Sequence, residues 1–246
     1  MKALLLCKGP GAKLLSKKKL KEYDFIAWAN WNNYKDKTIN IPRRVDKLYL
    51  YDHTYITTLP QETLEEIKKD LKVKSIKILN SHKIISEEKT KKWLNDLCKC
   101  WDREYENFES EVNYFGDATE MQSYWPKKPS TGHAALVDLT LNYNFDEIHV
   151  AGMDLFSGRQ YYFDVRETIV SKGGKRKLEN FLKKASKDQT SRGILKTAHP
   201  EGSAMKKIIR LVKRHPHIKY TFYSTNKSYK RNFLKYNLTN GRLIHK

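Results

Sequence analysis

The chain alternates short apolar segments with segments of helical periodicity, and this alternation limits the folds that it can adopt. Strand-like segments are expected at residues 2–7, 25–29, 47–51, 75–79, 147–151 and 219–223. Helices are expected at residues 12–21, 61–71, 87–100, 131–143 and 202–215. Strands separated by helices favour a parallel sheet, because a parallel connection needs a crossover. We therefore predict a single α/β domain over residues 1–246, with a mainly parallel, twisted sheet flanked by helices.

Residues 157–197 interrupt this alternation. Glycines and basic residues are scattered through the segment, and only residues 178–185 have a helical pattern. An insertion of this length in a compact domain is usually functional or disordered. Because it lies between an aspartate-ended strand and His199, we expect a lid over an active site.

The positive charge is large and unevenly distributed. The chain has 48 Lys and Arg residues against 28 Asp and Glu residues, which gives a net charge of +20. Seven lysines precede the first acid, Glu22, and 12 Lys and Arg residues follow Glu201 with no acid among them. This asymmetry predicts attraction to polyanions that weakens as salt rises. The alternative is that lysine is abundant because the coding genome is AT-rich, and only solvates the surface.

Residues 224–246 form a basic C-terminal tail in this interpretation. Aromatic residues are interleaved with the basic residues of the tail and of the strand before it, and such mixtures favour contact with bases and phosphates. These aromatic residues are Tyr220, Phe222, Tyr223, Tyr229, Phe233 and Tyr236.

Two features indicate the class of protein and its compartment. No stretch approaches the roughly 20 apolar residues of a membrane-spanning helix, and the apolar start is too short for a signal peptide. The three cysteines are odd in number and fit neither a disulfide framework nor a zinc site. We expect a cytoplasmic protein, or one in the host cytoplasm if it is viral.

Three segments carry candidate chemistry. Gly9 and Gly11 follow the first strand, where they would let the backbone approach a nucleotide, and the helix start after them favours a phosphate. Their alternative role is a simple strand-to-helix turn. Ser130 and Thr131 open a helix with hydroxyls and N–H groups that suit a phosphate or a cytosine ring, although an ordinary helix cap is the alternative. His199 is the candidate general base, because imidazole titrates near neutral pH.

These segments resemble the nucleotide-binding motifs of sialyltransferases. The strand, the glycine turn and a second strand ending in Asn30 resemble the first motif of the bacterial members. The run Pro129-Ser130-Thr131-Gly132, continuing to Asp154, is similar to the second motif, which the animal members share. His199 stands where both groups place their catalytic histidine. The resemblance implies a single nucleotide-binding domain of the sialyltransferase-like GT-A variant, a CMP-sugar donor and one-step inverting transfer.

The resemblance also implies roles for individual residues. Tyr161, with Tyr162, matches a tyrosine that bonds the leaving phosphate, and Lys128 takes the place of an arginine. No Asp-x-Asp motif is present, so we expect neither a metal nor a cofactor besides the CMP-sugar. The donor-binding positions are Lys8, Gly9, Gly11, Asn30, Asp52, Ser130, Thr131, Gly132 and Asp154.

Two departures from the bacterial pattern concern the donor sugar. Lys8 replaces an asparagine of the glycine turn, and Asp52 replaces an asparagine close to the sugar. An aspartate would repel the carboxylate of sialic acid but could accept hydrogen bonds from an uncharged sugar. We therefore expect a CMP-sugar other than CMP-sialic acid.

The acceptor follows from the charge. A net charge of +20 without a membrane anchor suits an enzyme that glycosylates DNA on a hydroxymethylated base, as some bacteriophages do. In this hypothesis residues 172–196 and the tail after Ser224 hold phosphates. One alternative is a sialyltransferase that acts on a cell-surface or lipid-linked oligosaccharide, and another is a nucleic-acid-binding protein without catalysis.

Overall fold

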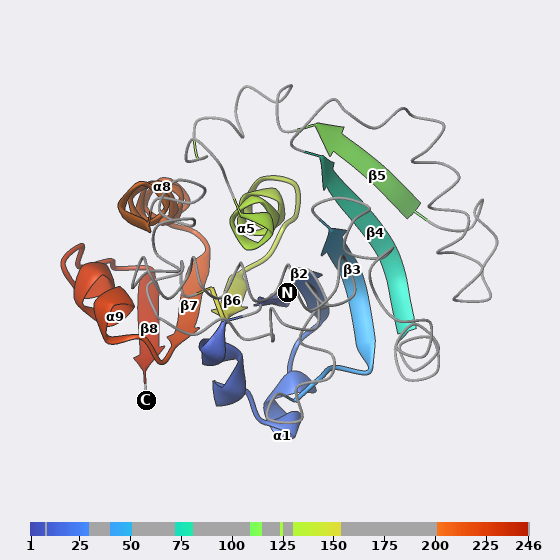
Figure 1. The fold of residues 1–246 in the computed structure, drawn as a ribbon, viewed down its shortest axis with the longest axis horizontal. Coiled ribbons are helices and arrows are strands. Elements are labelled where there is room, and N and C mark those ends of the chain that lie inside the picture. Colours follow the sequence, from blue (N-terminus) through green and yellow to red (C-terminus); the bar gives the residue numbers. More distant parts are fainter. Residues whose placement is uncertain are drawn as a thin grey trace, which may run out of the picture.

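The computed structural model describes residues 1–7, 9–29, 40–50, 72–80, 109–114, 124, 130–153 and 201–245. Eight strands form one sheet in the order β5-β4-β3-β2-β1-β6-β7-β8, and all seven neighbouring pairs are parallel (Figure 1). The strands are β1 (Lys2–Leu6), β2 (Phe25–Ala29), β3 (Arg44–Leu50), β4 (Lys72–Asn80), β5 (Glu109–Tyr114), β6 (Glu147–Ala151), β7 (Lys219–Ser224) and β8 (Gly241–His245).

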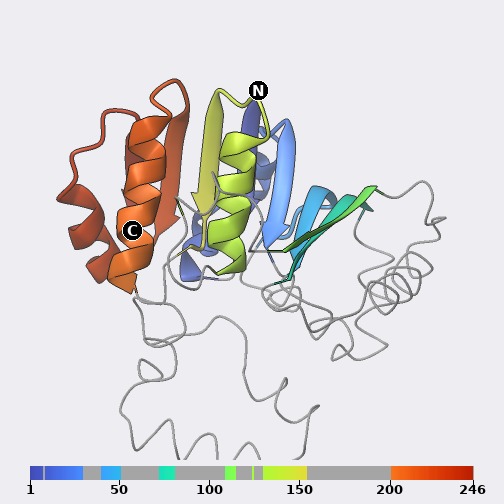
Figure 2. The ribbon, with the colours of Figure 1, turned by 90° about the horizontal axis from the view of Figure 1, so that it is seen from above.

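Helices cover both faces of this sheet (Figures 1 and 2). On one face lie α5 (Thr131–Leu141), α8 (Glu201–Arg214) and, toward the β8 edge, α9 (Lys227–Leu234). On the other face lie the 3-10 helix η1 (Pro10–Leu14) and the short helix α1 (Lys17–Leu20). The prediction of a mainly parallel sheet flanked by helices is therefore confirmed.

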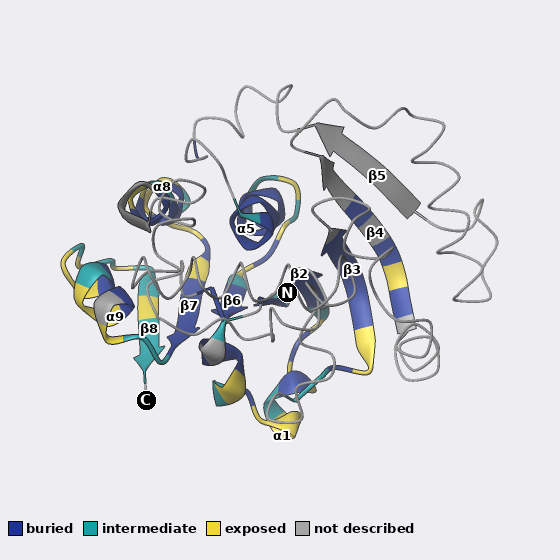
Figure 3. Cartoon of the chain, in the orientation of Figure 1, coloured by how far each residue is buried: buried dark blue, intermediate teal, exposed yellow. Residues whose placement is uncertain are grey.

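The central strands are apolar because both of their faces are covered, as is usual for parallel sheets. Ala3 and Leu5 belong to the core under α5, and the alternate residues Leu4 and Leu6 are fully buried against the second face. Figure 3 shows the same burial along β6 and β7. The core therefore has two layers, one on each side of the sheet.

The strand segments expected from the sequence all form strands, but the sheet is wider than expected because β5 and β8 extend its two edges. The single helix expected at residues 12–21 is wrong. Leu15 and Ser16 separate η1 from α1, and the Ser16 hydroxyl accepts a hydrogen bond from the Lys19 N–H, which starts a new helix. The helices expected at 61–71 and 87–100 and the lid expected at 157–197 lie outside the described residues.

The C-terminal segment is part of this fold. Residues from Ser224 onward include α9 and β8, and β8 pairs with β7 along its length. The aromatic residues thought to contact bases lie in the core instead: Tyr220, Phe222, Tyr223, Tyr229 and Phe233 are each at most 3% exposed. Phe233 packs on Phe222 at 5.3 Å between ring centroids. In α9 the aromatic residues lie on the buried face and the basic residues on the exposed face, and β7 is buried from Tyr220 to Ser224, so these aromatic residues do not form a stacking surface.

Candidate active site

The sheet has its topological switch point between β1 and β6. From β1 the chain moves outward through β2, β3, β4 and β5, whereas β6, β7 and β8 continue on the other side. In open parallel sheets the crevice outside the carboxyl ends of two such strands is where ligands bind. The two glycine-containing turns that follow β1 and β6 are therefore the first candidates for a site.

The turn after β1 is joined to the turn after β6 through the backbone. The Cys7 N–H donates to the Ala151 carbonyl and the Gly9 N–H to the Gly152 carbonyl, each at 2.7 Å. Gly152 has φ of +78°, and a Cβ there would lie 2.6 Å from the carbonyl oxygens of Cys7 and Gly9. Only glycine fits this position, so Gly152 sets the close approach of the two turns.

Gly11 makes a similar close approach to β7. A Cβ at Gly11 would lie 2.0 Å from the Tyr223 carbonyl oxygen, and the same oxygen accepts a hydrogen bond from the Gly152 N–H at 3.4 Å. Gly11 is buried, whereas Gly9 is partly exposed. Packing against the backbone of β7 therefore accounts for Gly11, and Gly9 is the glycine left open to a ligand.

The N-terminus of α5 lies at the same switch point. Ser130 is the N-cap, its Oγ accepting a hydrogen bond from the His133 N–H at 3.2 Å. A Cβ at Gly132 would lie 2.7 Å from Cys7 Sγ and 3.5 Å from Met153 Cε, so this helix end touches the chain after both β1 and β6. Thr131 is buried beside it. The glycine turn and the hydroxyl-rich turn, 120 residues apart in the sequence, are thus neighbours in the fold.

The capping role of Ser130 and a ligand-binding role are compatible. A hydroxyl has two acceptor lone pairs and one hydrogen to donate, and the cap uses only one lone pair. The positive end of the α5 dipole points toward the same crevice, which favours an anion. This helix end can therefore hold a phosphate while it remains capped.

The other candidate residues lie outside the described residues. Lys8 is between Cys7 and Gly9, and Asn30, Asp52 and Asp154 come shortly after the ends of β2, β3 and β6 in the sequence. Those strand ends lie at one edge of the sheet because the strands are parallel. Lys128, Tyr161, Tyr162 and His199 are also outside the described residues, and their roles stay predictions. Another histidine, His133 of α5, is buried with Nε2 2.9 Å from the Tyr124 carbonyl oxygen, which fits a packing role.

A buried ion cluster anchors α5 over the sheet. Asp138, which is completely buried, accepts hydrogen bonds from Lys77 Nζ at 2.6 Å, from the Tyr49 hydroxyl at 2.5 Å and from Asn142 Nδ2 at 2.7 Å. Lys77 and Tyr49 belong to β4 and β3. The cluster fixes the position of α5 along the sheet, and so the position of its N-terminus. The isolated acid within an apolar helix was the sequence signal for it.

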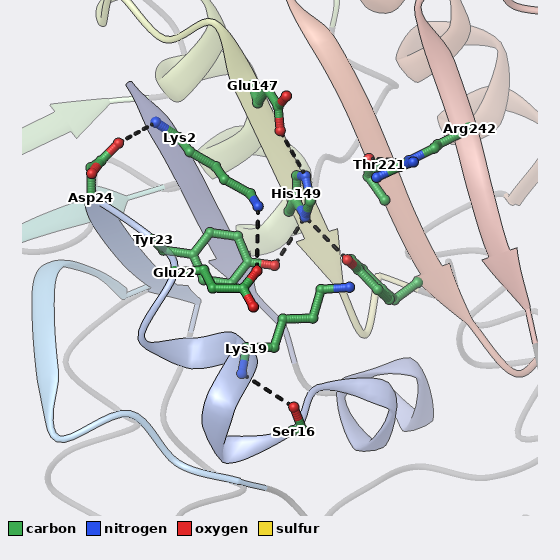
Figure 4. Close-up of polar contacts among 11 residues, drawn as sticks. Lys2, Ser16, Lys19, Glu22, Tyr23, Asp24, Glu147, His149, Thr221 and Arg242 are labelled. Carbon is green, nitrogen blue, oxygen red and sulfur yellow. Dashed lines mark hydrogen bonds and ion pairs between the residues drawn. The ribbon is translucent and has the colours of Figure 1, made fainter.

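A second polar cluster lies on the opposite face, around His149 of β6 (Figure 4). The Tyr23 and Tyr223 hydroxyls lie 2.9 and 3.1 Å from His149 Nδ1, and Glu147 Oε2 lies 3.3 Å from Nε2. Burial, with the positive charge of Lys2 nearby, lowers the pKa of His149 to about 4. Burial also raises the pKa of Tyr23 above its ordinary value. His149 is therefore neutral at pH 7, with Nδ1 as the acceptor for a tyrosine hydroxyl.

Neither cluster includes a site residue predicted from the sequence, but both lie next to the switch point. Tyr223 belongs to the His149 cluster through its side chain and meets Gly11 and Gly152 through its carbonyl. Asp138 belongs to the helix that carries the hydroxyl-rich turn. The two clusters thus hold the walls of the candidate site from opposite faces of the sheet.

The described residues contain neither a metal-binding group nor a membrane-spanning helix. In that part of the chain, no three His, Cys, Asp or Glu side chains are grouped so that they could hold a metal ion. The helices within the same ranges include none with the length and apolar character that crossing a bilayer requires.

No family model matches the sequence, and no curated protein matches it. Solved structures do match. Sialyltransferase CstII from Campylobacter jejuni with the substrate analogue CMP-3FNeuAc has a TM-score of 0.54 at 14% identity, covering 99% of this chain and 89% of that chain. CstII with a trisaccharide acceptor and CMP has a TM-score of 0.53 at 14% identity, covering 99% and 89%. The monofunctional α-2,3-sialyltransferase Cst-I from Campylobacter jejuni has a TM-score of 0.55 at 12% identity, covering 99% and 83%. The chain has the fold of these sialyltransferases over nearly its whole length, as the resemblance of its motifs implied.

Proposed function

We propose that this chain is an inverting glycosyltransferase that uses a CMP-activated sugar as its donor. The observation that carries the proposal is the meeting of the glycine turn after β1, the turn at Gly152 and the N-terminus of α5 at the switch point of the sheet. Solved structures of the same fold hold CMP or a CMP-sugar analogue, which supports cytidine monophosphate as the nucleotide.

In this proposal the donor phosphate lies against the N-terminus of α5. Ser130 and Thr131 offer hydroxyls and Gly132 a backbone N–H, while Gly9 leaves room for the nucleotide. Lys8, Asn30, Asp52 and Asp154 complete the donor site from the ends of neighbouring strands, as the resemblance implies. The donor is an uncharged sugar, because Asp52 would repel a carboxylate.

The reaction is a single displacement. The oxygen of an acceptor hydroxyl forms a bond to the anomeric carbon, the bond from that carbon to the phosphate oxygen breaks, and CMP leaves with the electron pair. His199 takes the hydroxyl proton as general base. Lys128, Tyr161 and Tyr162 stabilise the negative charge that grows on the leaving phosphate, so that no metal is needed.

The acceptor in this proposal is a hydroxymethylated base in DNA. The support is the net charge of +20 and its concentration in segments without acids, which attracts a polyanion. The base would be turned out of the duplex to reach the site. An oligosaccharide acceptor is the second candidate, because a solved structure of this fold holds a trisaccharide acceptor together with CMP.

Calorimetric titration of CMP, with UMP as the control nucleotide, tests the donor site. We expect CMP to bind and UMP to bind at least about tenfold more weakly, since the site would recognise the cytosine ring. A panel of CMP-sugars in the same assay identifies the sugar. Absence of CMP binding by the folded protein would contradict the donor assignment.

Release of CMP on addition of an acceptor tests the chemistry. His199→Ala should lower the rate by about 10²- to 10⁴-fold and leave CMP affinity unchanged, because a general base acts on the acceptor. His217→Ala, an exposed histidine two residues before β7, is the matched control and should leave the rate unchanged. Release with hydroxymethylated DNA supports the first acceptor, and release only with oligosaccharides supports the second. DNA binding without any turnover would support a nucleic-acid-binding protein without catalysis.

A further inference from the structure

The exposed faces of α8 and α9 are both strongly basic. In α8, Lys206, Arg210 and Lys213 are exposed, and the apolar side chains between them are buried against the sheet. In α9, Lys230 and Arg231 are exposed, and Tyr229 and Phe233 are buried. The two helices lie beside each other over the β7 and β8 end of the sheet in both views (Figures 1 and 2). We call the exposed side chains of these two helices the α8–α9 basic face.

Apart from Glu201, the first residue of α8, no acid occurs in the part of the chain that forms this face. The whole sequence has 28 acids in 246 residues, or about one in nine, yet the 45 residues from 202 to 246 contain none. Abundance of lysine codons cannot remove acids, so the asymmetry is not explained by genome composition. Within the described residues, the ion pairs of the structure do not include the exposed cations named above, which are Lys206, Arg210, Lys213, Lys230 and Arg231.

The lysines of α1 offer an internal comparison. Lys17, Lys18 and Lys21 are also exposed, but Glu22 and Asp24 follow them directly, and Glu22 lies 3.7 Å from Lys2 Nζ. Acids therefore moderate the charge on that side of the molecule. On the α8–α9 basic face, by contrast, Lys206 and Arg210 are like charges four residues apart, which destabilises a helix. A concentration of exposed cations with so few acids is expected where a polyanion is bound.

The α8–α9 basic face begins near the candidate site and extends along the edge of the molecule. Lys227 begins α9 three residues after β7 ends, so α9 starts at the edge of the sheet where the switch-point turns lie. The 14 residues of α8 span about 21 Å. Cations at Lys206, Arg210 and Lys213 are therefore spread over about 10 Å along its axis. The surface is large enough to contact several phosphates of one duplex.

We propose that the α8–α9 basic face binds the phosphate backbone of duplex DNA and holds it while a base is presented to the switch-point site. This inference specifies how the DNA acceptor of the proposed function is held. Its last step, the presentation of a base to the site, rests on that proposed function. A lipid surface is less well matched, because the apolar sides of both helices face the core, and only Leu234 among their described residues is a large exposed apolar side chain. The contact is to the backbone, since the aromatic residues of this region are buried.

Two triple variants with equal charge change test the surface. Lys206→Gln, Arg210→Gln and Lys230→Gln together remove three cations from the face, and Lys17→Gln, Lys18→Gln and Lys21→Gln remove three from α1, so that each net charge falls from +20 to +17. Binding of a short fluorescent duplex is measured over a range of salt, and thermal unfolding confirms that both variants fold. We expect at least about tenfold weaker binding at 0.1 M salt for the first variant, and a salt slope less steep by about 2 to 3. The α1 variant should bind within about threefold of the unmodified chain.

Each other outcome contradicts the surface assignment. Equal losses in the two variants would show that only total charge matters. Binding to vesicles of anionic phospholipid without binding to DNA would assign the face to a membrane surface. CMP titration separates these results from the proposed function: if CMP does not bind but the duplex does, the donor proposal fails and the surface stands. If CMP binds and the duplex does not, the surface fails and the glycosyltransferase stands.

Discussion

Buried polar groups are stabilised in different ways on the two faces of the sheet. Under α5, Asp138 keeps its charge with Lys77, Tyr49 and Asn142 as hydrogen-bond donors. On the opposite face, His149 loses its charge instead, and two tyrosine hydroxyls and Glu147 surround the neutral ring. A carboxylate away from water needs a full set of donors, whereas an imidazole needs only to shed a proton.

This difference matters for the site because each cluster supports a different element around it, α5 in one case and β7 in the other. The charged cluster locates the helix that ends in the hydroxyl-rich turn, and the neutral cluster packs beneath the strand whose carbonyl meets Gly11. We expect the charged cluster to respond strongly to mutation, because loss of one partner leaves the other charge buried. The neutral cluster should respond to pH below neutrality, because the pKa of His149 is lowered to about 4 in the folded chain.

Breaking the charged cluster should have the largest effect. Asp138→Ala leaves the Lys77 ammonium buried without its carboxylate, which should lower the free energy of unfolding by about 3 to 5 kcal/mol. The double variant Asp138→Leu with Lys77→Met removes both charges and should recover part of that loss. Urea unfolding measures both variants. A double variant as unstable as the single one would show that the buried lysine is not the cause.

Lowering the pH should weaken the neutral cluster. The pKa of His149 is about 4 in the folded chain and about 6.5 when unfolded, so between these values only the unfolded state binds the proton. The contribution of neutral His149 to the free energy of unfolding is therefore fully present above about pH 6.5, and it falls by about 3 kcal/mol as the pH drops to 4. His149→Gln should remove this part of the pH dependence. The carboxylates and lysines around the ring are the same in both proteins, so the difference between the two profiles isolates His149; identical profiles would contradict the assignment.

The sequence predicts the fold better than it predicts these clusters. Strand segments such as residues 147–151 are recognisable because apolar runs and glycine turns are local signals. The partners of Asp138 come from β3 and β4, about 60 to 90 residues earlier in the chain, and no local pattern pairs them. The edge strand β8 was missed because its residues are only partly buried, and partly buried edges lack a continuous apolar run. The packing of Gly11 against the backbone of β7 could not be predicted either, because Tyr223 lies more than 200 residues away in the sequence.

Adding a methyl group at Gly132, where α5 meets the turn after β1, should lower the free energy of unfolding by an intermediate amount. A Cβ at Gly132 would lie 2.7 Å from Cys7 Sγ, so Gly132→Ala should cost about 1 to 3 kcal/mol through overpacking. Cys7→Ala removes the sulfur and should reduce that cost in the double variant, which a double-mutant cycle detects. No such rescue is available for Gly11→Ala, whose Cβ would meet a backbone carbonyl. A cycle without coupling would mean that α5 does not touch the turn after β1 at this point.

The smallest expected change in stability is at Ser130, where it separates capping from donor binding. Ser130→Ala removes the acceptor of the His133 N–H and should cost about 1 kcal/mol, whereas Ser130→Asn keeps a cap and should cost less. If the hydroxyl hydrogen also bonds the donor phosphate, CMP affinity should fall several-fold in both variants, because neither offers a hydroxyl in that place. Thermal unfolding and CMP titration on the same two proteins decide the matter. CMP affinity could instead be low in the alanine variant and restored in the asparagine variant, in parallel with stability. Ser130 would then act only as a helix cap, and Thr131 would be the hydroxyl that contacts the phosphate.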